Sequence, residues 1–136
     1  MNQHFPTKRT LIVCVFCLLI MACTKQPFEP DYTNAGGYVI GRENCKANDD
    51  DYWLVDLSVY SNTPQYGDTL TLNGGVYTNV VKLKGLDQRL KQVGIRVSID
   101  FKTVTPDKVI TSGCGVASPI TYSLKELFII NQGEIR

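Results

Sequence analysis

The most constraining feature of this 136-residue chain is a strict alternation of side-chain character between residues 95 and 102. Every second residue is apolar, and the residues between them are polar or charged. The apolar set is Ile95, Val97, Ile99 and Phe101, and the polar set is Arg96, Ser98, Asp100 and Lys102. A period of two is typical of an antiparallel strand with one buried and one solvated face. The sequence therefore predicts a β framework, with a strand over residues 95–105.

Other segments extend this β pattern. Alternation over 52–60 predicts a strand, and apolar segments at 38–42 and 120–130 predict the first and last strands. Residues 69–84 predict a hairpin, because Asn73-Gly74-Gly75 interrupts two β-rich runs and Asn-Gly favours a tight turn that matches strand twist.

One segment has helical spacing. Leu86, Leu90 and Val93 fall at i, i+4 and i+7, and Gly94 stands where a helix of about two turns would end. The resulting order is strand, strand, strand, short helix, strand, strand. This is the order of an OB-type barrel, a small Greek-key barrel. The sequence therefore predicts a mainly β, five-stranded OB-like barrel, with one short helix between strands 3 and 4.

The N-terminal segment has the pattern of a secretory signal. Lys8 and Arg9 precede an unbroken apolar run over 11–22, which ends in the small residue Ala22 followed by Cys23. This order resembles a bacterial lipobox, which implies cleavage between Ala22 and Cys23 and a lipid on Cys23. Twelve apolar residues in a helix cover only about 18 Å, short of the roughly 30 Å of a membrane core. A cleaved signal is therefore favoured over an uncleaved anchor, and lipidation over plain secretion.

Cleavage at this site divides the chain into three parts. They are a signal peptide (1–22), a lipidated flexible tether (23–35) and one folded domain (36–136). The tether carries two prolines and mixed polar residues. Because nothing acidic directly follows Cys23, we expect a lipid-anchored envelope protein in the outer membrane, on its periplasmic or its surface face.

The remaining cysteines favour a disulfide. Cys14 and Cys17 leave with the signal and Cys23 takes the lipid, so only Cys45 and Cys114 remain in an oxidising compartment. We expect these two to pair. The alternatives are two free thiols or a metal site with two thiolate ligands.

Charge and histidine content exclude several functions. After cleavage the chain has 12 basic and 13 acidic residues, which gives no electrostatic basis for binding nucleic acid. The only histidine, His4, lies in the signal. Ser-His-Asp triads, Cys-His pairs and histidine-ligated zinc are thereby excluded from the mature protein. We expect no enzyme activity, no cofactor and no metal site.

Three tyrosines provide the best candidate interaction surface. Tyr60, Tyr66 and Tyr77 border residues 61–76, and exposed aromatic residues on loops are typical of protein or sugar contacts. The alternative is ordinary packing at the edge of the sheet.

Other polar groups have simpler interpretations. Asp49-Asp50-Asp51 lacks the spacing of a calcium loop and is interpreted as a solvated turn. Asp56 and Asp100 are interpreted as solvated charges on outer faces, although a carboxylate pair can hydrolyse glycosides without histidine. Trp53 is assigned to the core. A local basic cluster is interpreted as a solvated face, with anionic lipid headgroups as the alternative partner; its members are Lys82, Lys84, Arg89 and Lys91.

Several short motifs together resemble small bacterial secreted and lipoprotein OB-like domains, including the N-terminal OB-like domain of NigD-like lipoproteins. The motifs are Gly37-Tyr38-Val39, Cys45, the 85–94 segment, Arg96–Phe101, Cys114 and a final apolar strand. The chain departs from this pattern at Gly85-Leu86-Asp87, where Asn-Leu-Pro is common, and in extra residues between Ser61 and Val76. The resemblance implies an OB-like fold and a disulfide that ties the first strand to the loop before the last. It implies no defined activity.

These observations lead to one functional expectation and two alternatives. We expect a lipid-anchored, non-enzymatic binding or accessory module, whose partners are the membrane through Cys23 and an envelope protein or glycan. The first alternative is a protective inhibitor or immunity lipoprotein that blocks an extracellular hydrolase or toxin with the 61–76 loop. The second is a hydrolase that uses carboxylates alone.

Overall fold

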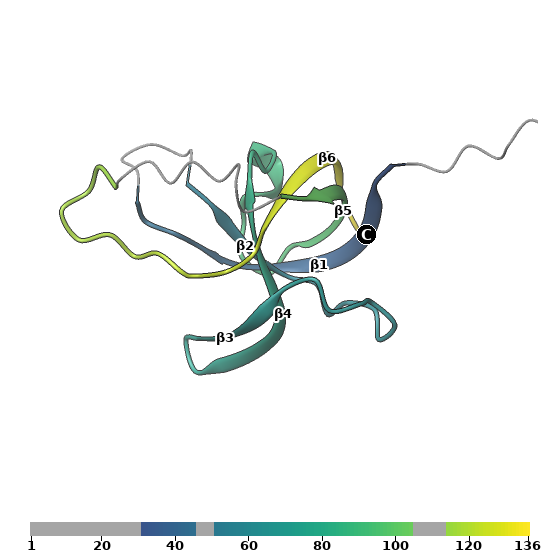
Figure 1. Cartoon of the computed structure of the whole chain (residues 1–136), viewed down its shortest axis with the longest axis horizontal. Helices are drawn as coiled ribbons and strands as arrows, with labels where there is room; N and C mark the ends of the chain where they lie inside the picture. Colours follow the sequence, from purple (N-terminus) through teal and green to yellow (C-terminus); the bar gives the residue numbers. More distant parts are fainter. Residues whose placement is uncertain (1–30, 46–50, 105–113) are drawn as a thin grey trace, which may run out of the picture. The chain divides into compact units, whose positions relative to one another are not determined.

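The computed structural model describes residues 31–45, 51–104 and 114–136, and residues 31–136 form one compact unit. Within the described ranges, the elements are six strands and one 3₁₀ turn (Figure 1). In chain order they are β1 (Thr33–Arg42), β2 (Trp53–Asp56), β3 (Asp68–Leu72), β4 (Gly75–Lys84), η2 (Gln88–Leu90), β5 (Arg96–Thr103) and β6 (Glu126–Glu134). The expectation of a mainly β domain is confirmed.

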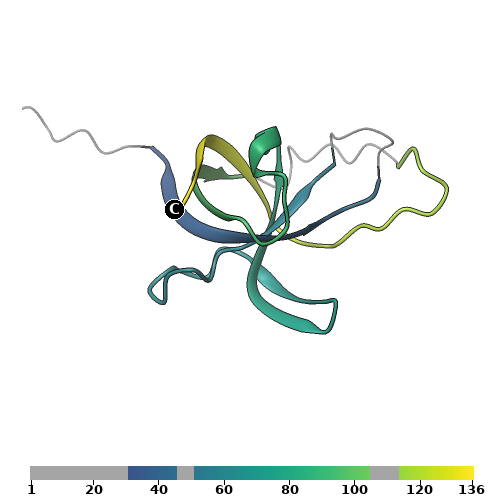
Figure 2. The same ribbon diagram turned by 180° about the vertical axis from the view of Figure 1, so that it is seen from behind.

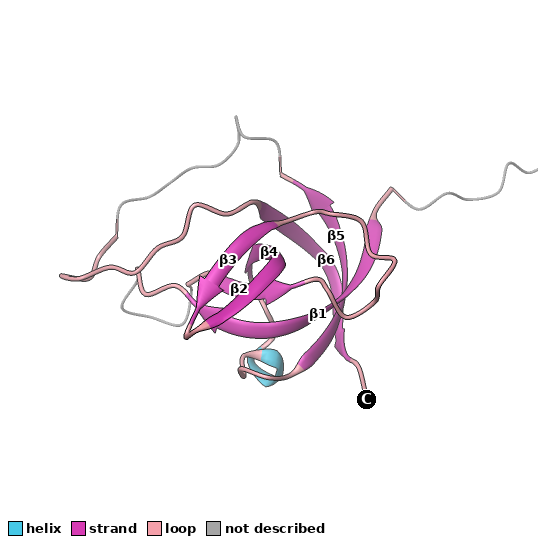
Figure 3. Cartoon of the chain, turned by 90° about the horizontal axis from the view of Figure 1, so that it is seen from below, coloured by secondary structure: helices cyan, strands magenta, loops and turns pink. Residues whose placement is uncertain are grey.

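All six strands belong to one sheet, and five of them pair in a closed ring. The sheet order is β2-β1-β5-β6-β4-β3, and an additional pairing joins β2 to β4. The ring therefore runs β1, β2, β4, β6, β5 and back to β1 (Figure 3). Its pairings are antiparallel except the parallel pair of β4 and β6. The sequence predicts a five-stranded barrel, whereas the described part of the chain has six strands, because β3 pairs with β4 alone and lies outside the ring.

The hydrophobic core fills the inside of the ring. The strict alternation in β5 is confirmed, since Val97, Ile99 and Phe101 are all buried there. Trp53 also lies in the core, as expected. The other buried members are Ala35, Val39, Val55, Leu57, Val81, Leu83, Leu86, Leu90 and Leu127. Gly37 lets β1 approach β2, because a Cβ at this position would lie 2.4 Å from the Val55 side chain.

The β3–β4 hairpin has the predicted turn. Asn73 and Gly74 both have positive φ, at 51° and 81°, and Leu72 pairs with Gly75 across them. Two successive positive φ values are the requirement of a type I′ turn, which explains the Asn-Gly pair. The tip of this hairpin extends away from the ring in both Figure 1 and Figure 2.

The predicted two-turn helix is wrong: only the three-residue 3₁₀ turn η2 forms between β4 and β5. Gly85 and Gly94 both have positive φ, which limits the segment to a length at which an isolated helix is marginal. Its flanking backbone also bonds to β1 instead of continuing a helix. The Gly94 N–H donates to the Val39 carbonyl at 2.8 Å. Leu86 and Leu90 are nevertheless buried, whereas Val93 is exposed, so the helical spacing is right for two of its three core contacts and wrong for the backbone.

Three strand boundaries also differ from those predicted. β1 begins at Thr33, inside the stretch assigned to the tether. β2 ends at Asp56 and not near residue 60, although the Leu57 N–H still donates to the Asn79 carbonyl of β4. The last strand starts at Glu126, and Ile120 forms only an isolated bridge with Asn44. Among the described residues, no helix is long and apolar enough to cross a membrane.

Candidate functional site

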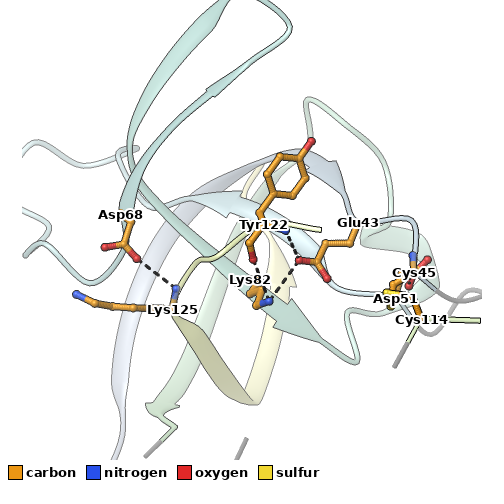
Figure 4. Close-up of polar contacts among 8 residues, drawn as sticks. All are labelled: Glu43, Cys45, Asp51, Asp68, Lys82, Cys114, Tyr122 and Lys125. Atoms are coloured by element: carbon orange, nitrogen blue, oxygen red, sulfur yellow. Dashed lines mark hydrogen bonds and ion pairs between the residues drawn. A yellow bond between two sulfur atoms is a disulfide. The ribbon is translucent and has the colours of Figure 1, made fainter. Parts of the chain in front are cut away.

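A disulfide joins Cys45 and Cys114, which confirms the predicted pair (Figure 4). The two Cα atoms are 4.6 Å apart and the residues are separated by 69 positions. The Cys45 N–H donates to Asp51 at 3.1 Å, and its carbonyl accepts from the Gly115 N–H at 2.8 Å. The disulfide therefore ties the connection after β1 to the connection before β6.

A mostly buried ion pair lies near this disulfide. Lys82 of β4 extends its Nζ to within 3.3 Å of Glu43 Oε1, and their side chains are only 18% and 3% exposed. Glu43 also accepts the Tyr122 N–H at 2.8 Å, and Lys82 donates to the Tyr122 carbonyl at 3.1 Å (Figure 4). The Lys82 Nζ stands 4.9 Å from the centre of the Tyr52 ring. The two charges thus hold the backbone of Tyr122 against the outside of β4.

Residues 120–125, which we call the strap, cover an apolar outer face of the ring. Ile40, Leu54 and Val80 point outward from three neighbouring strands and are nevertheless buried. The side chains packed over them come from the strap and from the β3–β4 hairpin; they are Tyr122, Leu124, Leu70, Leu72 and Tyr77. This face is therefore closed by the chain itself, and a ligand would have to displace the strap or the hairpin to reach it.

Asn79 of β4 makes several hydrogen bonds to the loop over residues 57–67. Asn79 Oδ1 accepts the N–H groups of Tyr66 at 2.9 Å and Gly67 at 2.7 Å, and Nδ2 donates to the Pro64 carbonyl at 3.0 Å. Gly67 fits this arrangement, since a Cβ there would lie 2.2 Å from the Val80 carbonyl oxygen. The loop is consequently pre-formed by hydrogen bonds to β4.

The structure does not gather the three candidate tyrosines on one surface. Tyr60 is 48% exposed, and its ring lies over Gly36. Tyr66 is half-buried and packs edge-on against Phe101, with ring centres 5.1 Å apart. Tyr77 packs over the closed outer face. Of the three, Tyr60 is exposed, and Tyr66 and Tyr77 are half-buried.

The carboxylates of Asp56 and Asp100 both accept hydrogen bonds within the fold, which the sequence does not predict. The expectation that Asp56 is solvated is wrong, because it is buried and accepts hydrogen bonds from Ser58 and from the Asn79 N–H. Asp100 is half-buried and accepts from Asn34 at 2.6 Å.

Of the Asp49-Asp50-Asp51 run, the structure describes only Asp51. Asp51 is buried, contrary to a fully solvated turn, whereas Asp49 and Asp50 lie outside the described residues. Within the described ranges, no group of three or more Asp, Glu, Cys or His side chains is arranged to hold a metal ion.

The local basic cluster does not form one surface. Lys82 faces Glu43, and Arg89 pairs with Asp87 at 3.4 Å beside η2. Lys84 comes level with Phe128 in the pairing of β4 with β6. The description of these residues as one solvated face is therefore wrong for Lys82.

Sequence reasoning missed the polar groups that organise this part of the molecule. Asn79 immediately precedes the apolar pair Val80-Val81, so it is a polar residue at the start of a buried stretch. That pattern indicates that Asn79 is buried, but it does not identify the loop to which Asn79 forms hydrogen bonds. Glu43 has no comparable signal, because its partners are 39 and 79 positions away.

Comparisons with known proteins identify no relative. No family model, no curated protein and no solved structure matches the chain. The predicted cleavage and lipidation residues, Ala22 and Cys23, lie outside the described residues.

Proposed function

We propose that this chain is a lipid-anchored bacterial envelope protein whose OB-like barrel acts as a non-enzymatic binding or accessory module. The observation that supports the barrel is the closed ring β1-β2-β4-β6-β5 with its parallel β4–β6 pair. A partly open five-stranded Greek-key barrel is the architecture of OB domains. The hairpin strand β3 is then an addition to that ring.

The disulfide position agrees with the same proposal. It connects the segment after β1 to the segment before β6, which is the tie implied by the resemblance to NigD-like lipoproteins. OB domains commonly bind ligands on the outer face of their second and third strands. The strap and hairpin cover much of the corresponding face here. Partner contacts are therefore expected on surfaces that the chain leaves exposed.

The lipid anchor has a direct test. Expressed in a bacterial host, the full chain is expected in the membrane fraction, with the mass increase of a diacylglyceryl group on Cys23. Cys23→Ser is expected to move most of the protein to the soluble fraction, because two or more acyl chains are needed for firm anchoring. Ser118→Ala is the matched control, since it changes an exposed residue outside the lipobox and leaves the disulfide intact. Membrane fractionation and intact mass are measured for each variant. Unchanged membrane association of Cys23→Ser would contradict the lipid anchor.

The non-enzymatic assignment rests on sequence and on the carboxylate environments. Residues 23–136 contain no histidine, and Asp56 and Asp100 are engaged by neighbouring side chains and backbone. The carboxylate hydrolase is therefore the third candidate. Turnover of a substrate by purified protein, lost on changing one carboxylate, would contradict the proposal.

A protective inhibitor is the second candidate, and the pre-formed 57–67 loop favours it. Loops that are rigid before binding lose less conformational entropy on association, which is a common feature of inhibitors. Asn79 fixes this loop, and Tyr60 is exposed on it. Such a loop can insert an aromatic side chain into a partner with little rearrangement.

Replacement of Tyr60 tests the inhibitor candidate. If the loop is the contact, Tyr60→Ala is expected to weaken capture of the partner from envelope extracts by at least about tenfold, as for an aromatic residue central to an interface. Val93→Ala is the control, because Val93 is also an exposed apolar residue and does not belong to the loop. Quantitative pull-down measures both variants. Equal capture by Tyr60→Ala and the parent chain would rule out this loop as the contact.

A further inference from the structure

Three large apolar side chains stand exposed near the point where the described chain begins. Phe128 of β6 is 64% exposed, and Ile130 and Tyr32 are exposed as well. Tyr32 directly precedes β1. The ring places β5 between β1 and β6 (Figure 3), so Tyr32 and the two β6 residues come from the two sides of β5. An exposed apolar group of this kind commonly marks an interaction surface.

The strand register aligns two of these residues with two lysines. Lys102 of β5 and Lys84 of β4 both pair with Phe128, one on each side, and residues paired in this way share a face. Thr33 pairs with Phe101, so Tyr32 comes level with Lys102. We call Tyr32, Lys102, Phe128 and Lys84 the aromatic–basic row. Aromatic and basic side chains alternate along it, and all four are exposed.

The composition of this row fits a membrane surface better than a protein groove. Aromatic side chains insert their apolar rings at the headgroup level, and lysines keep their ammonium groups in water beside anionic phosphates. Acidic residues near the row are Asp31, which pairs with Lys102, Asp100, which lies two positions before Lys102 on β5, and Glu126, which lies two positions before Phe128 on β6. Asp31 is almost fully exposed, and surface pairs of this kind contribute little. This pair can therefore open when a phosphate group competes for Lys102.

The beginning of the chain brings the same surface close to the proposed anchor. Asp31 is eight residues after Cys23, and eight residues span at most about 29 Å when fully extended. We propose that the aromatic–basic row is a membrane-contact surface that rests on anionic phospholipid headgroups. Its orientation in the cell rests on the lipid anchor proposed above, whereas its affinity for headgroups does not.

Vesicle flotation of unlipidated protein tests the row separately from the anchor. The chain from residue 23 with Cys23→Ser is mixed with phosphatidylcholine vesicles that contain or lack phosphatidylglycerol. Binding is expected only with phosphatidylglycerol and is expected to fall in about 0.5 M salt, because screening weakens exposed charges. Lys84→Gln and Lys102→Gln are each expected to lower affinity about fivefold. Asp31→Asn is expected to raise it, and Phe128→Ser to lower it at least as much as one lysine.

Two variants outside the row provide matched controls. Val76→Ser removes an apolar side chain that is 67% exposed near the β3–β4 turn, and Arg89→Gln removes an exposed charge near η2. Both are expected to bind vesicles like the parent. Circular dichroism and urea unfolding verify that Phe128→Ser remains folded, as expected for an exposed position.

Three results would overturn the proposal. They are equal binding to both vesicle types or to neither, equal losses in the control variants, and a Phe128-dependent dimer in sedimentation without vesicles. The last result would assign the surface to a second copy of the chain. If Cys23 carries no lipid in cells but the vesicle results hold, the anchor fails and the row stands. If Cys23 carries lipid but the vesicle results fail, the membrane-contact surface is rejected and the anchor stands.

Discussion

Replacing both Cys45 and Cys114 with serine is expected to lower the free energy of unfolding by about 2–5 kcal/mol. The disulfide closes a separation of 69 residues, and the chain-entropy model gives about 4 kcal/mol for a loop of this length. In the folded state the disulfide lies next to an isolated bridge, in which Asn44 and Ile120 exchange backbone hydrogen bonds. Urea unfolding of the chain from residue 23 with Cys23→Ser, compared with the doubly substituted variant, measures the difference.

Two further readings make the disulfide experiment specific. The dependence of unfolding on urea concentration is expected to steepen without the disulfide, because the unfolded chain exposes more surface when it is not cross-linked. Ser118→Ala is the matched control in the same exposed segment, and its effect is expected within about 0.5 kcal/mol. A double-serine variant as stable as this control would show that the bond constrains little.

The parts of the fold that follow local rules were accessible from sequence. The alternation in β5 and the Asn73-Gly74 turn each depend on residues within one strand or one turn, and both are confirmed. Pairing of Cys45 with Cys114 was predicted by elimination, on the expectation of an oxidising compartment, and the pair itself is confirmed. Periodicity and turn chemistry therefore suffice where a structure is decided by near neighbours.

The errors arose where distant segments decide the local structure. Leu86 and Leu90 have helical spacing, but two positive-φ glycines and hydrogen bonds to β1 leave only a 3₁₀ turn. Asp56 alternates to the outer side of β2 as predicted, yet it is buried and accepts hydrogen bonds from Ser58 and from the backbone N–H of Asn79 on β4. In both cases contacts with distant segments override the local pattern, and the pattern of a single strand does not reveal such contacts.

The candidate site depends even more on long-range contacts. The strap closes the outer face formed by Ile40, Leu54 and Val80, although the strap lies at least 40 residues beyond all three in the sequence. The pairing of Phe128 with both Lys84 and Lys102 likewise depends on the ring order of the strands. The row becomes visible only when the register is known, because its four residues are spread from 32 to 128.

Breaking the Glu43–Lys82 pair is expected to have the second large effect. Glu43→Ala leaves the Lys82 ammonium mostly buried without its carboxylate and leaves the Tyr122 N–H without its acceptor. Removing one partner of a buried ion pair typically costs about 3–5 kcal/mol. Because Lys82 is 18% exposed, solvent can reach it in part, and we expect the lower end of this range. Urea unfolding measures the loss, and hydrogen exchange of residues 120–125 is expected to accelerate with it.

The double variant Glu43→Met/Lys82→Met separates the pair's role from simple packing. Two apolar side chains of similar length remove both charges, so no unpaired ion is left on the outer side of β4. The remaining deficit is the Tyr122 N–H and carbonyl, and an unsatisfied buried backbone group costs about 1–3 kcal/mol. The double variant is therefore expected to be more stable than Glu43→Ala. If the two variants lose equal stability, an uncompensated charge does not explain the loss. The pair would then act chiefly by holding the strap through hydrogen bonds to Tyr122.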